Sequence, residues 1–318
     1  MKTSRPKRDS HAPGEFFFYN NWDFNTLGPI LERATGKRVA DEFRSRIVGP
    51  LGMEDFRPQD ASEQLEPSNS IHPAYAFRIS VRDLARFGQL YLQKGEWSGQ
   101  QVVPEAWIKE STSVQTTFED GSGYGYMWWV HPAGTLGAQS GLTLLDRVNK
   151  FSGRGTGGQF LLVIPGAELV FAHTVDTENG RSVRGPKVWK LAEMVLAAKV
   201  SEPAESQQSA ALNPARFSNA PPPLQEHHAV ELDSKKLAAF VGEYAAEPQM
   251  HVRVFEFHNR LFATVRGVGE AELFPESDTE FFTKTGNAQI SFIKDSAGRV
   301  TEARSQFNGQ TNTLPKSP

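Results

Sequence analysis

The side chains that could act as a nucleophile decide which covalent chemistry is open to the chain. The sequence contains no cysteine, which excludes thiolate catalysis, disulfides and cysteine metal sites. A serine hydroxyl is a weak nucleophile and needs a base beside it. A lysine follows a serine by three residues at two places, Ser4–Lys7 and Ser291–Lys294.

Neither pair lies in a suitable context. The first encloses Pro6 in a polar arm with a short basic run, which is typical of a solvated segment. The second lies in the alternating run AQISFIK, which predicts a strand, so Ser291 and Lys294 would not share a helical turn. The triplet KTG at 284–286 is interpreted as a turn between strands. Neither serine is therefore a convincing nucleophile.

Metal and cofactor chemistry has no better support. The adjacent pair His227 and His228 has no carboxylate or third histidine at ligand spacing, so we expect both side chains to be solvated. The pair lies in residues 201–229, a stretch that is rich in Pro, Ser, Gln and Ala and shows no apolar period. We interpret this stretch as an extended linker, and we expect no cofactor.

Charge and composition exclude further classes of protein. The 318 residues include 34 basic and 37 acidic side chains, which gives a formal net charge of −3, and 38% of them are hydrophobic. A packed core is therefore possible, but this balance of charge gives no attraction to nucleic acid or to an anionic membrane. No segment has the apolar length that a membrane-spanning helix needs.

The N-terminal residues bear on localisation, which the sequence leaves open. They are polar and lack the apolar stretch of a signal peptide. We expect a cytoplasmic protein if the chain starts at Met1. We expect a periplasmic or secreted one if the chain is cut from a precursor that carries a signal peptide.

The remaining sequence divides into two globular parts, residues 1–200 and 230–318. In the first part, the hydrophobic periodicity predicts helices at 27–34, 84–91 and 188–196, and strands at 126–130, 159–164 and 169–175. Pro29 implies a kink in the first helix or a late start, and Ser80 with Asp83 resembles a capping box. Adjacent strands followed by a helix predict an α+β fold, in which helices cover an antiparallel sheet.

An ordered set of motifs connects the first part to a known family. PGEFFFYNN at 13–21 is followed by a Leu-Gly pair, TG at 35–36, PLGM at 50–53 and GYGYMWW at 123–129. Together they resemble conserved blocks of the serine β-lactamase-like hydrolases, which include class C β-lactamases, esterases and D-alanyl-D-alanine peptidases. The resemblance runs from about residue 10 to 200 and implies the C-terminal portion of that fold, truncated at its N-terminus.

The resemblance implies acyl transfer through a serine ester. In the family, the lysine of a Ser-x-x-Lys helix turn and a tyrosine share the role of base. Tyr19 would be this tyrosine, and Asn21 would be the amide that orients the lysine and the substrate. Because the ordinary pKa of tyrosine is near 10, nearby positive charge must lower it for this role. The alternative is that Tyr19 is one more aromatic side chain packed beside Phe16–Phe18.

The family's third element is a Lys/His-Thr-Gly-like segment, which corresponds here to Gly153, Arg154 and Gly155. Small residues there keep backbone groups open to the acyl oxygen, as in an oxyanion hole. Glycine in place of lysine or histidine at the first position favours ester or amide hydrolysis over penicillin recognition. Arg154 either supplies the lost positive charge or faces solvent.

The second part also shows a resemblance. The motifs FVGEY, LFA, LFP, EFF and ISF between residues 240 and 292 resemble the small β-barrel domain that is often appended to these hydrolases. This resemblance implies a lipocalin-like, all-β domain over residues 230–318.

Two hypotheses about function follow. The favoured one is a serine hydrolase for a small-molecule ester or amide, present as a fragment that is inactive alone because the Ser-x-x-Lys block is missing. The alternative is a non-catalytic binding module that kept the pocket and lost the nucleophile. Without the preceding strands and helix, the segments around Phe160, Phe171 and Trp22 should expose apolar surface, so we expect self-association.

Overall fold

The computed structural model describes residues 6–199, 227–246, 250–266, 268–284, 288–307 and 310–317. The chain forms two compact units: Met1–Val175 with Ser182–Leu196, and Asp176–Arg181 with Ala197–Pro318. Most of the predicted linker, residues 201–226, lies outside the described residues. The boundaries that the composition indicates, at 200 and 230, therefore stay predictions.

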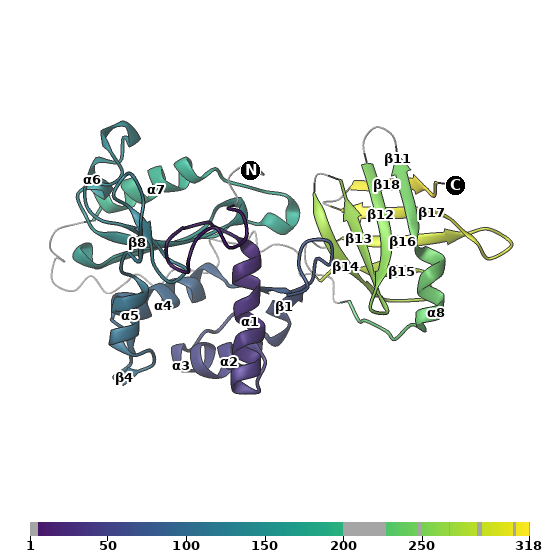
Figure 1. The fold of residues 1–318 in the computed structure, drawn as a ribbon, viewed down its shortest axis with the longest axis horizontal. Helices are drawn as coiled ribbons and strands as arrows, with labels where there is room; N and C mark the ends of the chain where they lie inside the picture. The colour runs from purple at the N-terminus through teal and green to yellow at the C-terminus, as the bar shows by residue number, and fades with distance from the viewer. Residues whose placement is uncertain are drawn as a thin grey trace, which may run out of the picture. The chain divides into compact units, whose positions relative to one another are not determined.

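The first unit combines helices and strands (Figure 1). Its helices are α1 (Asn21–Thr35), α2 (Val39–Phe43), α3 (Gly49–Leu51), α4 (Val81–Leu92), α5 (Glu105–Ser111), α6 (Thr143–Asp146) and α7 (Gly185–Ala197). Its strands are β1 (Ala61–Gln64), β2 (Ala74–Phe77), β3 (Glu96–Trp97), β4 (Gln100–Gln101), β5 (Thr116–Thr117), β6 (Gly123–Tyr124), β7 (Trp129–His131), β8 (Lys150–Gly155), β9 (Gln159–Ile164) and β10 (Leu169–His173). A π-helical turn, Arg44–Val48, joins α2 to α3.

Six of these strands form one antiparallel sheet in the order β10-β9-β8-β7-β6-β5. Helix α4 packs on the sheet through Gly88, where an added Cβ would lie 2.5 Å from Val170 Cγ1 and 2.8 Å from Leu161 Cδ1. Helix α7 contributes Val188 and Ala192 to a separate core with β9 and β10. The predicted α+β fold, an antiparallel sheet covered by helices, is therefore confirmed.

Helix α1 begins where the sequence provides a cap. The Asn20 side-chain oxygen accepts a hydrogen bond from the Trp22 N–H at 3.1 Å. The helix then runs through Pro29 and ends at Gly36, whose φ of 70° favours glycine. A late helix start at Pro29 is therefore wrong, because the cap lies upstream of the proline. Inside the helix, an added Cβ at Gly28 would lie 1.8 Å from the ring of Tyr75, so this ring packs directly on the helix backbone.

The capping box expected before α4 is present only in part. Ser80 accepts a hydrogen bond from the Asp83 N–H, as predicted. The Asp83 carboxylate, however, is fully buried and accepts hydrogen bonds at 3.0–3.2 Å from three successive N–H groups of residues 54–56. It also pairs with Arg86 at 2.7 Å. This carboxylate therefore joins the preceding loop to the helix.

The predicted strand 126–130 is interrupted. Gly125 donates a hydrogen bond from its N–H to the carbonyl of Trp128 at 2.8 Å, and Met127 has a φ of 66°. These features make a tight turn between β6 and β7. The regular strand therefore begins only at Trp129. The strands predicted at 159–164 and 169–175 are present as β9 and β10, joined at Pro165–Ala167.

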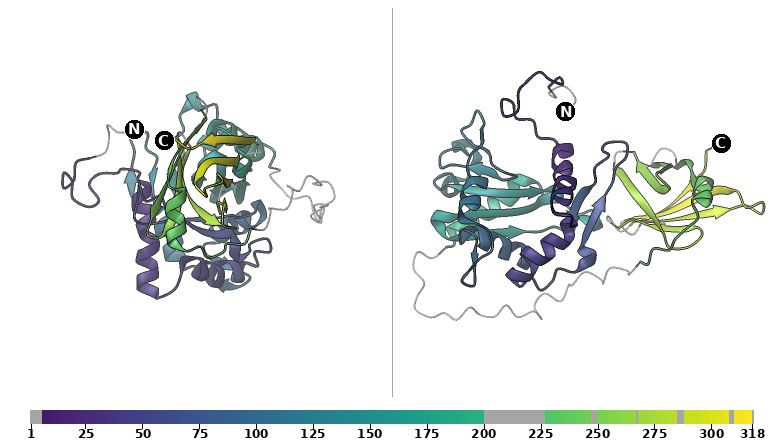
Figure 2. Two further views of the ribbon diagram at one scale, coloured as in Figure 1. Left: turned by 90° about the vertical axis from the view of Figure 1, so that its right-hand side faces the viewer. Right: turned by 60° about the horizontal axis from the view of Figure 1, so that its bottom comes forward.

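The second unit contains eight antiparallel strands that curl into a nearly closed barrel (Figures 1 and 2). They are β11 (Gly242–Ala246), β12 (Met250–Phe257), β13 (Arg260–Val265), β14 (Gly269–Pro275), β15 (Glu280–Phe282), β16 (Gln289–Lys294), β17 (Val300–Phe307) and β18 (Gln310–Pro315). The first and last strands meet through a bridge between Tyr244 and Lys316. The helix α8 (Ser234–Leu237) precedes β11, and Phe240 packs in the barrel core. The predicted C-terminal barrel is therefore confirmed.

His227 corrects one detail of the expected linker. Its side chain is only 9% exposed, and its Nδ1 lies 2.9 Å from Glu276 Oε1. Its ring also stacks on Phe282 at 4.7 Å. The prediction of a solvated His227 is wrong, because the barrel surface offers it both a carboxylate and an aromatic ring. His228 is exposed, as predicted.

None of the helices in the described parts of the chain combines the length and the hydropathy that crossing a bilayer requires.

Candidate active site

Tyr19 lies in the segment directly before α1, and Asn21 is the first residue of that helix. Asn20, between them, is occupied as the helix cap, and its Nδ2 also donates to Asp23 Oδ1 at 3.3 Å. Asn21 is the exposed first residue of the helix. Tyr19 directly precedes the cap and is 46% exposed. The tyrosine and the asparagine of the motif are therefore both open to solvent.

The ring of Tyr19 lies in an aromatic cluster. It stacks on Trp129 at 5.7 Å between centroids, and it contacts Phe24 at 4.9 Å and Tyr124 at 6.2 Å. Among the ring contacts of the described residues, Tyr19 has none with Phe16–Phe18, which the alternative interpretation expected. The cluster fixes the ring while nearly half of the residue stays open.

Trp129 connects Tyr19 to the segment at 153–155. In the sheet, Trp129 of β7 is directly opposite Ser152 of β8, and Arg154 lies two residues further on, on the same face. The Arg154 guanidinium carbon lies 5.0 Å from the centroid of the Trp129 ring. Two segments that are far apart in the sequence therefore meet at one tryptophan.

The guanidinium of Arg154 is held by neutral groups. Its Nε donates to Ser152 Oγ at 3.2 Å, and its Nη2 lies 2.6 Å from His131 Nε2. It also lies within 6 Å of the rings of Phe160 and Trp189. Desolvation lowers the pKa of Arg154 to about 10, so the group stays positively charged at neutral pH. Part of the residue remains exposed.

The two glycines of the segment differ in their surroundings. An added Cβ at Gly155 would lie 2.9 Å from the Gln159 Cβ, so a side chain there would collide with the start of β9. At Gly153 the nearest atom would be Trp128 Cζ3, at an ordinary contact distance of 3.8 Å. Glycine is therefore required by packing at 155 but not at 153.

The other candidate residues lie elsewhere. Ser291 and Lys294 are on β16 of the barrel, paired with β17, as their alternating pattern predicted. Lys284 Nζ lies 3.9 Å from the centroid of the Phe274 ring, and the other two residues of its triplet are outside the described residues. Ser4 is also outside them. Neither Ser291 nor Lys284 belongs to the unit that contains Tyr19.

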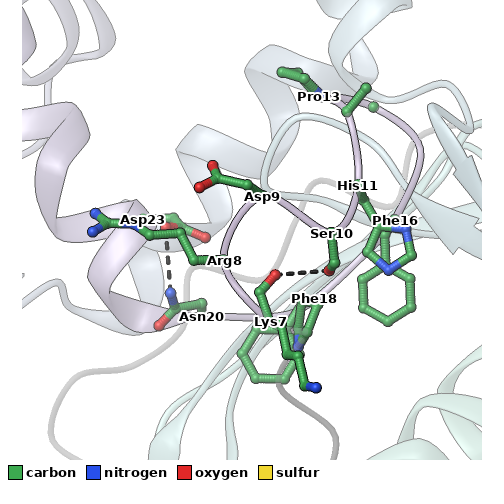
Figure 3. A pocket seen from close by; sticks show the side chains of 13 residues that line it. Lys7, Arg8, Asp9, Ser10, His11, Pro13, Phe16, Phe18, Asn20 and Asp23 are labelled. Atoms are coloured by element: carbon green, nitrogen blue, oxygen red, sulfur yellow. Dashed lines mark hydrogen bonds between the residues drawn. The ribbon is translucent and has the colours of Figure 1, made fainter.

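A hollow near Tyr19 is formed by the N-terminal arm (Figure 3). It is lined by polar side chains such as Lys7 and Asp9, together with Phe16 and Phe18. The Ser10 hydroxyl donates to the Lys7 carbonyl at 2.7 Å. Neither Tyr19 nor Arg154 lines this hollow.

In the described part of the chain, no three histidine or acidic side chains are placed to hold a metal ion.

Two residues of this region, His131 and Ser152, were not singled out from the sequence, and Trp129 was noted only as the end of the GYGYMWW motif. Trp129 and His131 alternate along β7, and Ser152 and Arg154 alternate along β8. That alternation places the two residues of each pair on one face of their own strand. It becomes informative only once the register between the two strands is known.

Comparison with known proteins assigns the family. Residues 1–192 match the family described as Beta-lactamase, and residues 226–314 match "Domain of unknown function (DUF3471)". The first match covers more than half of the chain. The chain therefore belongs to the beta-lactamase family, a family of serine hydrolases.

The related proteins extend beyond the part of their length that matches this chain. An uncharacterized protein of Alkalihalophilus pseudofirmus is 33% identical over 49% of this chain and 51% of its own length. Penicillin-binding protein 4* of Bacillus subtilis is 22% identical over 88% of this chain and 62% of its own length. A solved structure, a putative 6-aminohexanoate-dimer hydrolase from Bacillus anthracis, has a TM-score of 0.44 and 24% identity over 58% of this chain and 44% of that one. The chain thus spans between about half and three-fifths of the curated relatives.

Proposed function

We propose that this chain carries the tyrosine side of an acyl-transfer site that hydrolyses a small-molecule ester or amide through a serine ester. One observation carries the proposal: Tyr19 and Arg154 contact the same ring, Trp129. A base and a stabilising positive charge must border one reacting carbon, and this shared ring brings the two segments to one place on the sheet.

In this proposal each residue has a defined task. Tyr19 accepts the proton of the nucleophile, and its exposed position leaves it reachable. Asn21 orients the amide of the substrate. Gly153 and Gly155 keep backbone groups open to the acyl oxygen, while Arg154 supplies the positive charge that the glycine at 153 does not. With glycine at that position, we favour simple esters or amides over penicillins.

The nucleophilic serine, in this proposal, comes from a segment outside these 318 residues. Ser291 and Lys294 both lie on strand β16, so they do not share a helical turn. The part of the curated relatives that this chain does not span leaves room for the missing element. The isolated chain should therefore be nearly inactive, since loss of the nucleophile costs about six orders of magnitude in turnover.

The second candidate function is a binding module without catalysis. It is favoured by the exposed aromatic rings of Phe16, Tyr19 and Trp22, which lie close together in the sequence, because such rings suit ligand contact as well as catalysis. The upstream reading frame separates the two. An in-frame Ser-x-x-Lys segment supports the hydrolase, whereas a stop codon followed by a ribosome-binding site supports the binding module.

A labelling experiment tests the isolated chain. The purified protein is treated with a fluorophosphonate probe and assayed with a p-nitrophenyl ester. We expect no stoichiometric labelling and almost no turnover. A serine labelled in every molecule would place a working nucleophile inside this sequence and overturn the proposal that it comes from outside.

If the upstream reading frame encodes the serine, the role of Tyr19 is tested in that longer protein. Tyr19→Phe should lower kcat by about 10²–10⁴-fold, the usual contribution of a general base. Tyr126→Phe is the matched control, because it removes an exposed hydroxyl that donates to Glu110 Oε1 at 2.8 Å. Equal activity of the two variants would show that Tyr19 is not the base.

A further inference from the structure

The contact between Arg154 and His131 fixes the protonation of the histidine. An arginine N–H can only donate, so His131 Nε2, at 2.6 Å from Arg154 Nη2, must accept. The proton of the neutral ring then lies on Nδ1. A doubly protonated imidazole would direct a donor at a donor. The geometry therefore requires the neutral Nδ1–H form.

That form leaves a polar group unsatisfied. His131 is only 8% exposed, and its Nδ1 is buried with no hydrogen-bond partner among the described residues. A buried donor without a partner destabilises the folded state. Another interaction must therefore offset this cost. The other ring nitrogen, Nε2, contacts Arg154.

The surroundings keep the ring neutral. Burial is the largest cause, followed by the positive charges of Arg154 and Lys150 on β8, and together they lower the pKa of His131 to about 4. Asp120, in the turn between β5 and β6, acts in the opposite direction. From α7, the Trp189 ring meets the imidazole edge-on at 5.6 Å. At neutral pH the ring is therefore an uncharged acceptor.

We propose that His131 is a positioning residue for Arg154, and that it holds the guanidinium without neutralising its charge. A carboxylate at this position would bind the guanidinium more tightly but would cancel the charge. The other partners, the Ser152 hydroxyl and the aromatic rings, are also neutral. Among the described residues, no ion pair includes Arg154. Its charge therefore remains available to the site.

This inference rests on the proposed function only in placing Arg154 at the site, and its test needs no turnover. The full chain is labelled with 15N-arginine, and the Arg154 signals are assigned by their loss in Arg154→Lys. Hydrogen exchange of the Arg154 guanidinium is then compared between wild type and His131→Phe, which keeps a ring but removes the acceptor. We expect exchange at least about tenfold faster in His131→Phe, because a hydrogen bond to a charged group is lost.

Rescue separates positioning from packing. His131→Gln offers an amide oxygen as acceptor and should restore slow exchange, whereas a role in packing alone would make His131→Phe the milder change. Far-UV circular dichroism establishes that each variant is folded. Unchanged exchange in a folded His131→Phe would overturn the inference.

The pH dependence gives an independent readout. Wild-type protection of the guanidinium should be lost as the pH falls toward about 4, where His131 gains its second proton. His131→Gln should show no such step. Protection in wild type that persists below pH 4 in the folded protein would contradict the assignment. If Tyr19→Phe were found to have no effect on activity, the proposed function would fail while these exchange results would stand.

Discussion

Trp129 shows which parts of the candidate site a sequence can reveal. Tyr19 and Arg154 were found because each lies in a short motif. Trp129 also lies in a motif, but its role in joining them, like that of His131, arises from the pairing of β7 with β8. A contact between strands depends on register, and register is set by the whole sheet and not by any local pattern.

A second residue of this cluster, Tyr124, predicts how stability depends on alkaline pH. It is 9% exposed, and burial raises its pKa to about 12. The unfolded tyrosine ionises near 10, so between these pH values the unfolded state releases a proton that the folded state keeps. The stabilisation is fully present below pH 10 and is lost as the pH rises toward 12, by about 2–3 kcal/mol for this residue.

Urea unfolding at pH 9 and pH 11 measures this effect. Tryptophan fluorescence reports on the first unit alone, because all six tryptophans lie between residues 22 and 189. Tyr124→Phe should reduce the loss of unfolding free energy between the two pH values. Lys150, whose pKa burial lowers to about 8, remains in both proteins and so cancels in the comparison. An identical loss in the variant would show that Tyr124 does not cause it.

Among the elements, helix α4 shows why local sequence signals can predict that a helix forms but not which distant residues its side chains contact. Its apolar period and its Ser80 cap were both readable from the sequence. The partner of the Asp83 side chain was not, because the loop that it binds, residues 54–56, lies far upstream. Likewise, the composition of 126–130 predicted one strand, but the hydrogen bond from Gly125 to Trp128 turns the chain there.

Asp83 gives a prediction for the coupling between these elements. Asp83→Asn keeps the shape but replaces one acceptor oxygen with a donor that faces backbone N–H groups, and it leaves Arg86 without its buried partner. We expect the free energy of unfolding to fall by about 3 kcal/mol, as when a buried charge pair is broken. Urea unfolding followed by tryptophan fluorescence measures it.

Asp41→Asn is the control for this change. Its pair with Arg44 is exposed on both sides, so its removal should cost at most about 1 kcal/mol. If the two variants lost the same stability, the network around Asp83 would not join the loop to the helix.

At the scale of the molecule, two compact units are present, and the barrel that the motifs indicated is one of them. The exact end of the connecting stretch was not predictable. His227 looks like part of a polar linker because its partners, Glu276 and Phe282, are about fifty residues away in the sequence. The boundaries at 200 and 230 depend on composition alone and stay predictions.

The prediction of exposed apolar surface around Phe160 and Phe171 is wrong, because both side chains are buried in a core with α7. The exposed apolar side chains of the first unit lie elsewhere. Strand β10 is the last strand at one edge of the sheet. Two helices also carry exposed apolar side chains: Leu27, Ile30 and Leu31 on α1, and Leu191, Met194 and Val195 on α7. Groups of this kind on one helix face are more typical of an interface than of a free surface, and an unpaired strand edge can accept another strand.

We therefore predict that the chain self-associates as its concentration rises. Ile30 is 61% exposed and Met194 is 59% exposed, so Ile30→Glu and Met194→Glu should leave the fold intact. Burial of one such side chain is worth about 1.5–3 kcal/mol, so each change should weaken association at least about tenfold in sedimentation experiments. Lys190→Glu also places a negative charge at an exposed position of α7, with a larger change in net charge but no loss of an apolar side chain, and should act less. A wild-type chain that stays monomeric at high concentration and binds no ANS would show that these side chains are ordinary surface.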